Sequence, residues 1–185
     1  RYSEPMDLPD GGLIKARTIM DGETGPVEER RLGIDPSGWE IISVSSFQSR
    51  WGLAENAFDG DPFTAWFTSR RRGDDTAPGH PHHLALDMGR IIQINGFTYL
   101  PPQDSRISGS MIETCRFEIS EDGKNWNIVQ KCEFGNIMND PSRRLVIFDN
   151  VQSSRYFRLT SLKGRENNPY AGAAEIEIIS QIDTK

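Results

Sequence analysis

Hydrophobic and polar residues alternate in short stretches along most of the chain, and long helical periodicity is absent. The stretches with alternating or strand-like apolar positions include HLALDMG, CRFEIS, RLVIFDNV, RYFRLTSL and AEIEIIS. A period of two places the apolar side chains on one face of a β-strand. Turn-forming pairs separate the stretches, among them Asp59-Gly60, Asn95-Gly96 and Asp122-Gly123. Many short strands with turns at this spacing predict an all-β sandwich or barrel.

The N-terminal segment has a pattern of its own. Within residues 1–34, LIKARTIM and VEERRL are strand-like and DGETG is a turn between them. A two-stranded hairpin is marginally stable alone, so we expect it to be a remnant of a second small β domain. Residues 35–38 are typical of a linker. We place the main domain at 39–182 and a short tail at 183–185, with one helical turn at 52–58.

Length and charge restrict the function. A chain of 185 residues can hold one domain with a good core, or one domain plus a small appendage. Its net charge of −6 argues against a nucleic-acid partner, which requires a surplus of Lys and Arg. The basic run 70–72 is followed by Asp74 and Asp75, which is typical of a solvated loop. No apolar run approaches the roughly 18 residues of a membrane span, and we expect a monomer.

The chain begins at Arg1 without a signal peptide, so we expect a piece of a longer protein whose own sequence does not reveal targeting. Cys115 and Cys132 flank the turn 121–125 almost symmetrically. In a hairpin they would face each other, either as a disulfide or, as we favour, as two buried thiols that pack like small apolar residues. Without a CxxC pair they do not form a zinc signature.

Several motifs follow one another along the chain, namely WEIISVSS, NAFDGDPFTAW, PHHLALDMG, INGFTYLP, FEISEDGKNW, RYFRLTSL and AGAAEIEI. Their order is similar to that of the coagulation-factor-type C domain, also called the discoidin domain. Residues 39–182 therefore resemble this family, and within it the bacterial galactose-binding-like carbohydrate-binding modules. The resemblance implies a jelly-roll β-sandwich of the galactose-binding-domain type.

The stretch PMDLPDGGLIKAR carries a second resemblance. It is similar to the last hairpin of the small immunoglobulin-like domain that follows the catalytic domain in some bacterial hexosaminidases, including chitobiases, and fucosidases. This implies a covalently linked upstream catalytic domain in a bacterial glycoside hydrolase that is secreted, periplasmic or at the cell surface.

The turn ENAFDGDPFTAW concentrates oxygen atoms beside two aromatic rings. Calcium takes 6–8 oxygen ligands from carboxylates, hydroxyls and backbone carbonyls. An EF-hand is excluded, because the sixth position from Asp59 is Thr64 and the twelfth is Arg70. The alternative is an Asx turn without metal. The family resemblance implies a structural Ca²⁺ held by Asp59, Asp61, Thr64 and Glu175, with backbone oxygens of Ala57 and Ala174.

Sugar binding needs a ring that stacks on the C–H face of a pyranose and polar groups for the hydroxyls. The resemblance places such a site in the loops beside the calcium turn. The candidate residues are Phe67, Arg70, Gln103, Asp104, Asn168 and Tyr170. Phe67 stands where the family often has His, and Pro102 where it has Arg. Arg70 or Arg106 could substitute for the missing groups. We therefore expect poor binding of free galactose.

Other aromatic and histidine residues favour structural roles. Trp39, Trp66 and Trp126 are expected in the core, as is Trp51, whose loop-like segment leaves a surface position as the alternative. His80, His82 and His83 have no Cys or other additional metal ligand nearby in the sequence. In an extended segment His82 and His83 point to opposite faces.

Enzymatic activity is not indicated, because no nucleophile elbow, phosphate loop or zincin helix is present. We expect a non-catalytic carbohydrate-binding module that tethers its hydrolase to a weakly bound glycan. The alternatives are a structural spacer and a protein- or lipid-adhesion domain. Adhesion would use apolar loop residues, for which Phe47, Trp51 and Phe67 are the candidates.

Overall fold

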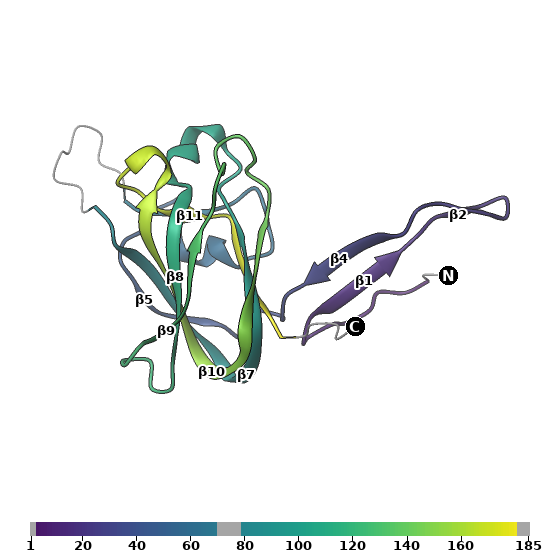
Figure 1. Cartoon of the computed structure of the whole chain (residues 1–185), viewed down its shortest axis with the longest axis horizontal. Helices are drawn as coiled ribbons and strands as arrows, with labels where there is room; N and C mark the ends of the chain where they lie inside the picture. Colours follow the sequence, from purple (N-terminus) through teal and green to yellow (C-terminus); the bar gives the residue numbers. More distant parts are fainter. Residues whose placement is uncertain (1–2, 70–78, 181–185) are drawn as a thin grey trace.

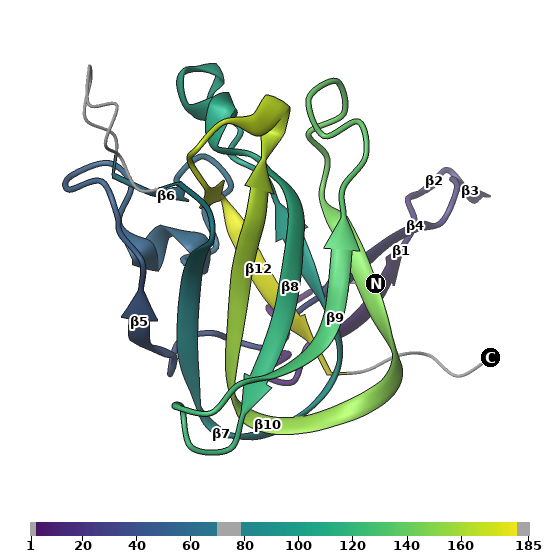
Figure 2. The same ribbon diagram turned by 60° about the vertical axis from the view of Figure 1, so that its left-hand side comes forward.

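Two long antiparallel strands form the centre of the fold, β7 (His82–Leu100) and β10 (Arg144–Gly164). The structure, a computed structural model, describes residues 3–69 and 79–180. The other strands of the main sheet are β5 (Glu40–Val44), β8 (Ile112–Ser120), β9 (Asn127–Glu133) and β12 (Glu175–Ile179). The hydrogen-bonded order β5–β7–β10–β8–β9 forms one layer and β12–β7–β10 forms the other, so β7 and β10 belong to both (Figure 2).

Strand β10 crosses between the layers where its pairing with β7 is irregular. The register shifts between Ile147 and Gln152 and again between Ser154 and Tyr156. Beyond that point β10 pairs with β8 as well. Short elements complete the described fold, namely β6 (Trp66–Phe67), β11 (Gly172–Ala173) and the 3-10 turns η1 (Ala54–Ala57), η2 (Ser105–Ser110) and η3 (Arg165–Asn167). The all-β prediction and the short helical turn near residue 55 are confirmed.

The core lies between the two layers. Its largest fully buried side chains include Trp66, Tyr99, Phe97, Phe117, Phe157, Leu84 and Leu86. The rings of Phe97 and Phe117 stack at 4.8 Å, and those of Phe117 and Phe157 at 5.5 Å. Burying one such side chain contributes about 1.5–3 kcal/mol. The alternation seen in the sequence thus selects the inward face of each strand.

Two of the four tryptophans lie in the core as predicted, and two do not. Trp39 and Trp66 are buried. Trp126 is only half-buried, and the Arg158 guanidinium lies over its ring at 4.5 Å. The preference for a core position at Trp51 was wrong, because this side chain is 68% exposed. Its loop turns the ring toward solvent.

The cysteines and histidines take structural positions. Cys115 and Cys132 lie directly opposite each other on β8 and β9 as free thiols. A hydrogen bond with Cys132 and burial both raise the pKa of Cys115. His82 is buried and His83 is half-exposed on the other face, as predicted. The ring of His82 hydrogen-bonds the Pro169 carbonyl at 2.7 Å, and so ties β7 to a loop.

The N-terminal hairpin projects from the sandwich (Figure 1). It consists of β1 (Gly12–Ala16), β2 (Ile19–Met20), β3 (Glu23–Thr24) and β4 (Glu28–Leu32), with β1 paired to β4 and β2 to β3. Its exit is anchored to the sandwich, since the Ile34 amide donates to the Ile178 carbonyl at 3.0 Å. Ile34 is only 4% exposed and belongs to the sandwich core. The buried core thus starts one residue before the predicted linker.

Candidate functional site

The turn at residues 55–66 is held by its own side chains. Asp59 Oδ1 accepts a hydrogen bond from the Asp61 amide at 2.9 Å, and Asp61 Oδ1 accepts one from the Phe63 amide at 2.9 Å. The Thr64 hydroxyl donates to Asp59 Oδ2 at 2.8 Å. Gly60 adopts φ +81°, which a residue with a Cβ rarely adopts. These are the Asx turns that the sequence offered as the metal-free alternative.

Glu175, the first residue of β12, adds an unusual group beside this turn. Its side chain is 4% exposed, and Oε1 has no hydrogen-bond partner. Burial raises the pKa of this carboxyl to about 7, and the negative charges of Asp59 and Glu177 add to the effect, while a hydrogen bond from the Gly60 backbone opposes it. A buried carboxylate oxygen without a partner is costly unless a cation or proton satisfies it.

The predicted calcium ligands fit a cation in part. Within the described residues, no three His, Cys, Asp or Glu side chains gather as a metal-binding cluster. The carboxylates would therefore need hydroxyl and backbone oxygens to complete a calcium shell. Thr64 hydrogen-bonds Asp59, and Ala57 lies on η1, which packs against β12. Ala174 precedes Glu175 and is fully buried. The donor set is chemically suited to Ca²⁺.

A cavity of about 360 Å³ opens next to the turn. Its lining residues are Arg50, Trp51, Asn56, Phe63, Thr64, Ala65, Phe67, Asp104, Arg106 and Ile107. Two of the rings are strongly exposed, Phe63 at 86% and Trp51 at 68%. Exposed rings in a cavity are suited to stacking on an amphipathic ligand.

Backbone contacts fix the loop that carries Trp51. The Trp66 indole N–H donates to the Ser46 carbonyl at 3.0 Å, and the Gln48 amide donates to the Phe67 carbonyl at 3.0 Å. A Cβ on Gly52 would come within 2.6 Å of the Phe67 ring. The loop therefore packs closely on β6, and only glycine fits there.

Charged groups line one part of this cavity. The Arg106 Nε lies 3.0 and 2.9 Å from the two carboxylate oxygens of Asp104, and these hydrogen bonds lower the pKa of Asp104. Asp104 also accepts a hydrogen bond from the Arg106 amide at 2.9 Å, which starts η2. Arg50 is exposed and adopts φ +78°. Among the described residues, its guanidinium makes no hydrogen bond or ion pair.

The predicted ligand residues do not all meet in this cavity. Phe67 and Asp104 line it, although Phe67 is only 6% exposed. The Gln103 amide nitrogen donates to the carbonyls of Pro101 and Pro141, at 2.7 and 3.0 Å. Asn168 Oδ1 accepts from the Tyr170 amide at 3.2 Å, and neither residue lines the cavity. Arg70 lies outside the described residues.

The lining residues that the sequence did not indicate as sugar contacts include Arg50, Trp51 and Phe63. The only signal for Trp51 and Phe63 was an aromatic residue within a turn-rich segment. Arg50 carried no signal of its own.

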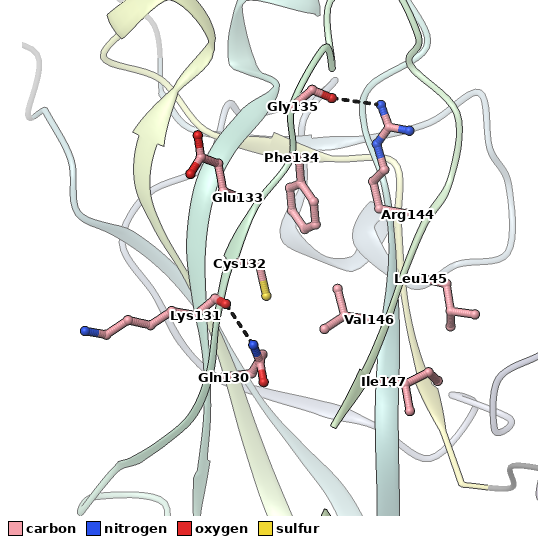
Figure 3. A pocket seen from close by; sticks show the side chains of 10 residues that line it. All are labelled: Gln130, Lys131, Cys132, Glu133, Phe134, Gly135, Arg144, Leu145, Val146 and Ile147. Atoms are coloured by element: carbon pink, nitrogen blue, oxygen red, sulfur yellow. Dashed lines mark hydrogen bonds between the residues drawn. The ribbon is translucent and has the colours of Figure 1, made fainter. Parts of the chain in front are cut away.

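A larger cavity, of about 510 Å³, separates the edge of β9 from the first part of β10 (Figure 3). Figure 3 shows Gln130 donating to the Lys131 carbonyl and Arg144 donating to the Gly135 carbonyl. The aromatic residue in its lining, Phe134, is 5% exposed. It offers no exposed ring for stacking, so the cavity at Trp51 is the better candidate for a sugar site.

Comparison with known proteins identifies the family. The family model described as F5/8 type C domain matches residues 40–176. The chain belongs to the F5/8 type C domain family. This confirms the resemblance found in the motif order. In the part of this F5/8 type C domain that the structure describes, no helix has the length and apolarity to cross a membrane.

Curated relatives share this domain within longer proteins. The chain is 31% identical over 150 residues to a sialidase of Micromonospora viridifaciens, which covers 80% of the chain and 22% of the sialidase. It is 30% identical over 145 residues to a galactose oxidase of Gibberella zeae, which covers 78% of the chain and 20% of the oxidase. The F5/8 type C domain thus spans about a fifth of these relatives' length.

Solved structures share its fold. CBM32-3 from a family 31 glycoside hydrolase of Clostridium perfringens is 27% identical, with a TM-score of 0.70 over 81% of this chain and 96% of that one. The C-terminal domain of a chitobiase from Bacteroides fragilis is 24% identical, with a TM-score of 0.66 over 82% and 99%. CpGH89CBM32-5 of C. perfringens is 24% identical, with a TM-score of 0.68 over 79% and 98%. These neighbours confirm the β-sandwich fold.

Proposed function

We propose that this F5/8 type C domain is a non-catalytic carbohydrate-binding module that tethers a secreted bacterial glycoside hydrolase to a glycan. The observation that carries the proposal is the pair of exposed rings, Trp51 and Phe63, at one cavity with polar groups. A ring of this kind stacks on the C–H face of a pyranose while polar groups bind its hydroxyls.

The relatives support this function. CpGH89CBM32-5 was solved in complex with GalNAc-β-1,3-galactose, and the family 32 module of NanJ in complex with galactose. Because Phe67 and Pro102 replace the His and Arg of the galactose-binding pattern, we expect a ligand other than free galactose. We also propose that a catalytic domain precedes this domain in the parent protein and that the parent protein is exported.

We expect weak binding. Exposed rings and solvent-competed hydrogen bonds supply about 4–6 kcal/mol, which corresponds to dissociation constants from roughly millimolar to tens of micromolar. Such affinity is sufficient when the module is linked to its catalytic domain, because attachment to a polymer raises the local concentration of substrate.

The test is a glycan array and calorimetry on the whole chain, with Trp51→Ala beside Tyr170→Ala. Trp51→Ala removes the proposed stacking ring and is expected to weaken binding at least tenfold, with little effect on stability because the ring is exposed. If Tyr170→Ala alone abolishes binding, the sugar site lies at Tyr170 and the neighbouring Asn168 instead.

The same variants separate the alternative functions. No binding to any glycan favours a structural spacer. Retention on lipid vesicles, lost in Trp51→Ala, favours adhesion through exposed loop residues, of which Phe47 is 45% and Trp51 68% exposed while Phe67 is buried.

We also propose a structural Ca²⁺ at the turn, held by Asp59, Asp61, Thr64 and Glu175 with backbone oxygens of Ala57 and Ala174. The partnerless buried oxygen of Glu175 supports it. A bound cation would offset the negative charges of Asp59 and Glu175 and hold the turn that carries Phe63 against the closing strand. The residues of the turn would then keep one wall of the cavity in place.

A further inference from the structure

We infer that the cavity at Trp51 selects a pyranose that bears a carboxylate, a hexuronate or a sialate, through the guanidinium of Arg50. This inference deepens the carbohydrate-binding function proposed above and rests on it. The carboxylate pairs with Arg50 while the sugar ring lies against Trp51 and Phe63.

The first step is the state of Arg50. Its side chain is exposed at the cavity, and no described residue pairs with its guanidinium. A guanidinium presents a planar set of donors that matches a carboxylate with two parallel hydrogen bonds. A sugar hydroxyl offers only one oxygen to the same group. Arg50 therefore distinguishes an acidic sugar from a neutral one.

The second step is the charge of the cavity. Its lining contains two guanidinium groups, Arg50 and Arg106, and one carboxylate, Asp104. Asp104 already accepts hydrogen bonds from Arg106. The lining is thus positive by one charge, whereas the whole chain carries −6. Asp61 lies close in sequence to Phe63 but does not line the cavity, and the cation proposed above would offset its charge.

The third step is the backbone. Arg50 adopts φ +78°, a conformation that is unfavourable for a residue with a Cβ and that glycine adopts freely. The Gly52 amide donates to the Gln48 carbonyl at 3.0 Å and closes this turn. The backbone conformation alone favours glycine at this position. We attribute the presence of arginine to binding of a ligand by its side chain.

The experiment measures binding to the whole chain by calorimetry in the presence of calcium. The first matched pair is digalacturonic acid and its methyl ester, which keep the ring and differ in charge. The second pair is sialyllactose and lactose. We expect at least one acidic ligand to bind about fivefold or more tightly than its neutral partner, and we expect added salt to reduce the difference. Which pair responds distinguishes a uronate from a sialate.

Two variants test the role of Arg50. Arg50→Gln removes the charge, and Arg50→Gly removes the side chain while relieving the backbone. Both are expected to equalise the acid and the neutral ligand, and Arg50→Gly is expected to fold at least as stably as the natural chain. Lys124→Gln, in the exposed turn between β8 and β9 at the other end of the sandwich, is the charge-matched control and should keep the preference.

The outcomes separate this inference from the proposed function. Equal affinity for acid and neutral ligand, with binding lost in Trp51→Ala, overturns the acidic preference and leaves carbohydrate binding intact. A preference that survives both Arg50 variants also overturns the role of Arg50. Absence of binding to all four ligands overturns this inference, while binding to another glycan on the array leaves the proposed function intact.

Discussion

At the scale of single residues, the pKa values of two buried carboxyl groups are shifted in opposite directions. Glu118 is 2% and Glu175 is 4% exposed. Burial would raise the pKa of Glu118, but hydrogen bonds from Arg158, at 2.9 and 2.7 Å, and from Thr160 outweigh it and lower the pKa. Glu175 has no cationic partner in contact, and its pKa is raised to about 7. Burial alone therefore does not decide the state of a carboxyl, and the unpaired one marks the expected cation site.

Glu175→Gln tests that site. At pH 8 in EDTA we expect the variant to be more stable than the natural chain by about 1 kcal/mol after allowance for solvent screening, because a buried charge is removed. With calcium in excess the order should reverse, since a ligand that binds only the folded state adds roughly 2.7 kcal/mol at a hundredfold excess over its Kd. Melting curves with and without calcium measure both effects.

Glu118→Gln is the control, and its free energy of unfolding should fall by about 1–3 kcal/mol under both conditions. A natural chain whose melting does not respond to EDTA would contradict the calcium site.

At the scale of elements, the ion pair between Asp87 and Arg155 joins β7 to β10 near the second register shift. The Arg155 Nε and a terminal nitrogen donate to the two Asp87 oxygens, both at 2.7 Å. Asp87 Oδ1 also accepts from the Gly89 amide at 2.7 Å, which fixes the turn within β7. A single side chain thus serves two elements at the point where β10 changes layers.

Asp87→Asn tests this junction through pH. Hydrogen bonds from Arg155 lower the pKa of Asp87, so the folded state binds its proton less readily than the unfolded chain. The stabilisation is fully present above the ordinary pKa near 4 and is lost as the pH falls through the lower folded-state value. Urea unfolding should show the variant about 1 kcal/mol less stable at pH 7, and this difference should shrink as the pH falls below 4. A difference that stays constant with pH would mean that side-chain shape, rather than charge, acts here.

At the scale of the whole molecule, the fold could be predicted from the sequence, but the residues of the candidate site could be predicted only in part. Alternation directs Leu84, Leu86 and Phe157 inward whatever their partners are, so strand positions could be predicted locally. The exposure of Trp51 depends on the packing of Gly52 against Phe67, a contact that no local pattern encodes. Gln103 likewise looked available for a ligand, yet its amide is engaged by Pro101 and Pro141.

The boundary between hairpin and sandwich is the remaining prediction at this scale. The strands of the hairpin pair with each other, and its contacts with the sandwich include the Asp10–Arg90 ion pair, at 2.5 Å, and the Ile34 amide. Deletion of residues 1–33 should leave a cooperatively folding sandwich, because its core stays complete. Extending the deletion through Ile34 removes a buried side chain and should cost a further 2–4 kcal/mol or so, as large-to-small core changes do. Urea unfolding of the two truncated chains measures the difference.

Loss of a cooperative transition after removal of residues 1–33 alone would show that the hairpin is an integral layer of the sandwich. Equal stability of the two truncated chains would place the domain boundary at residue 35, as the sequence predicts.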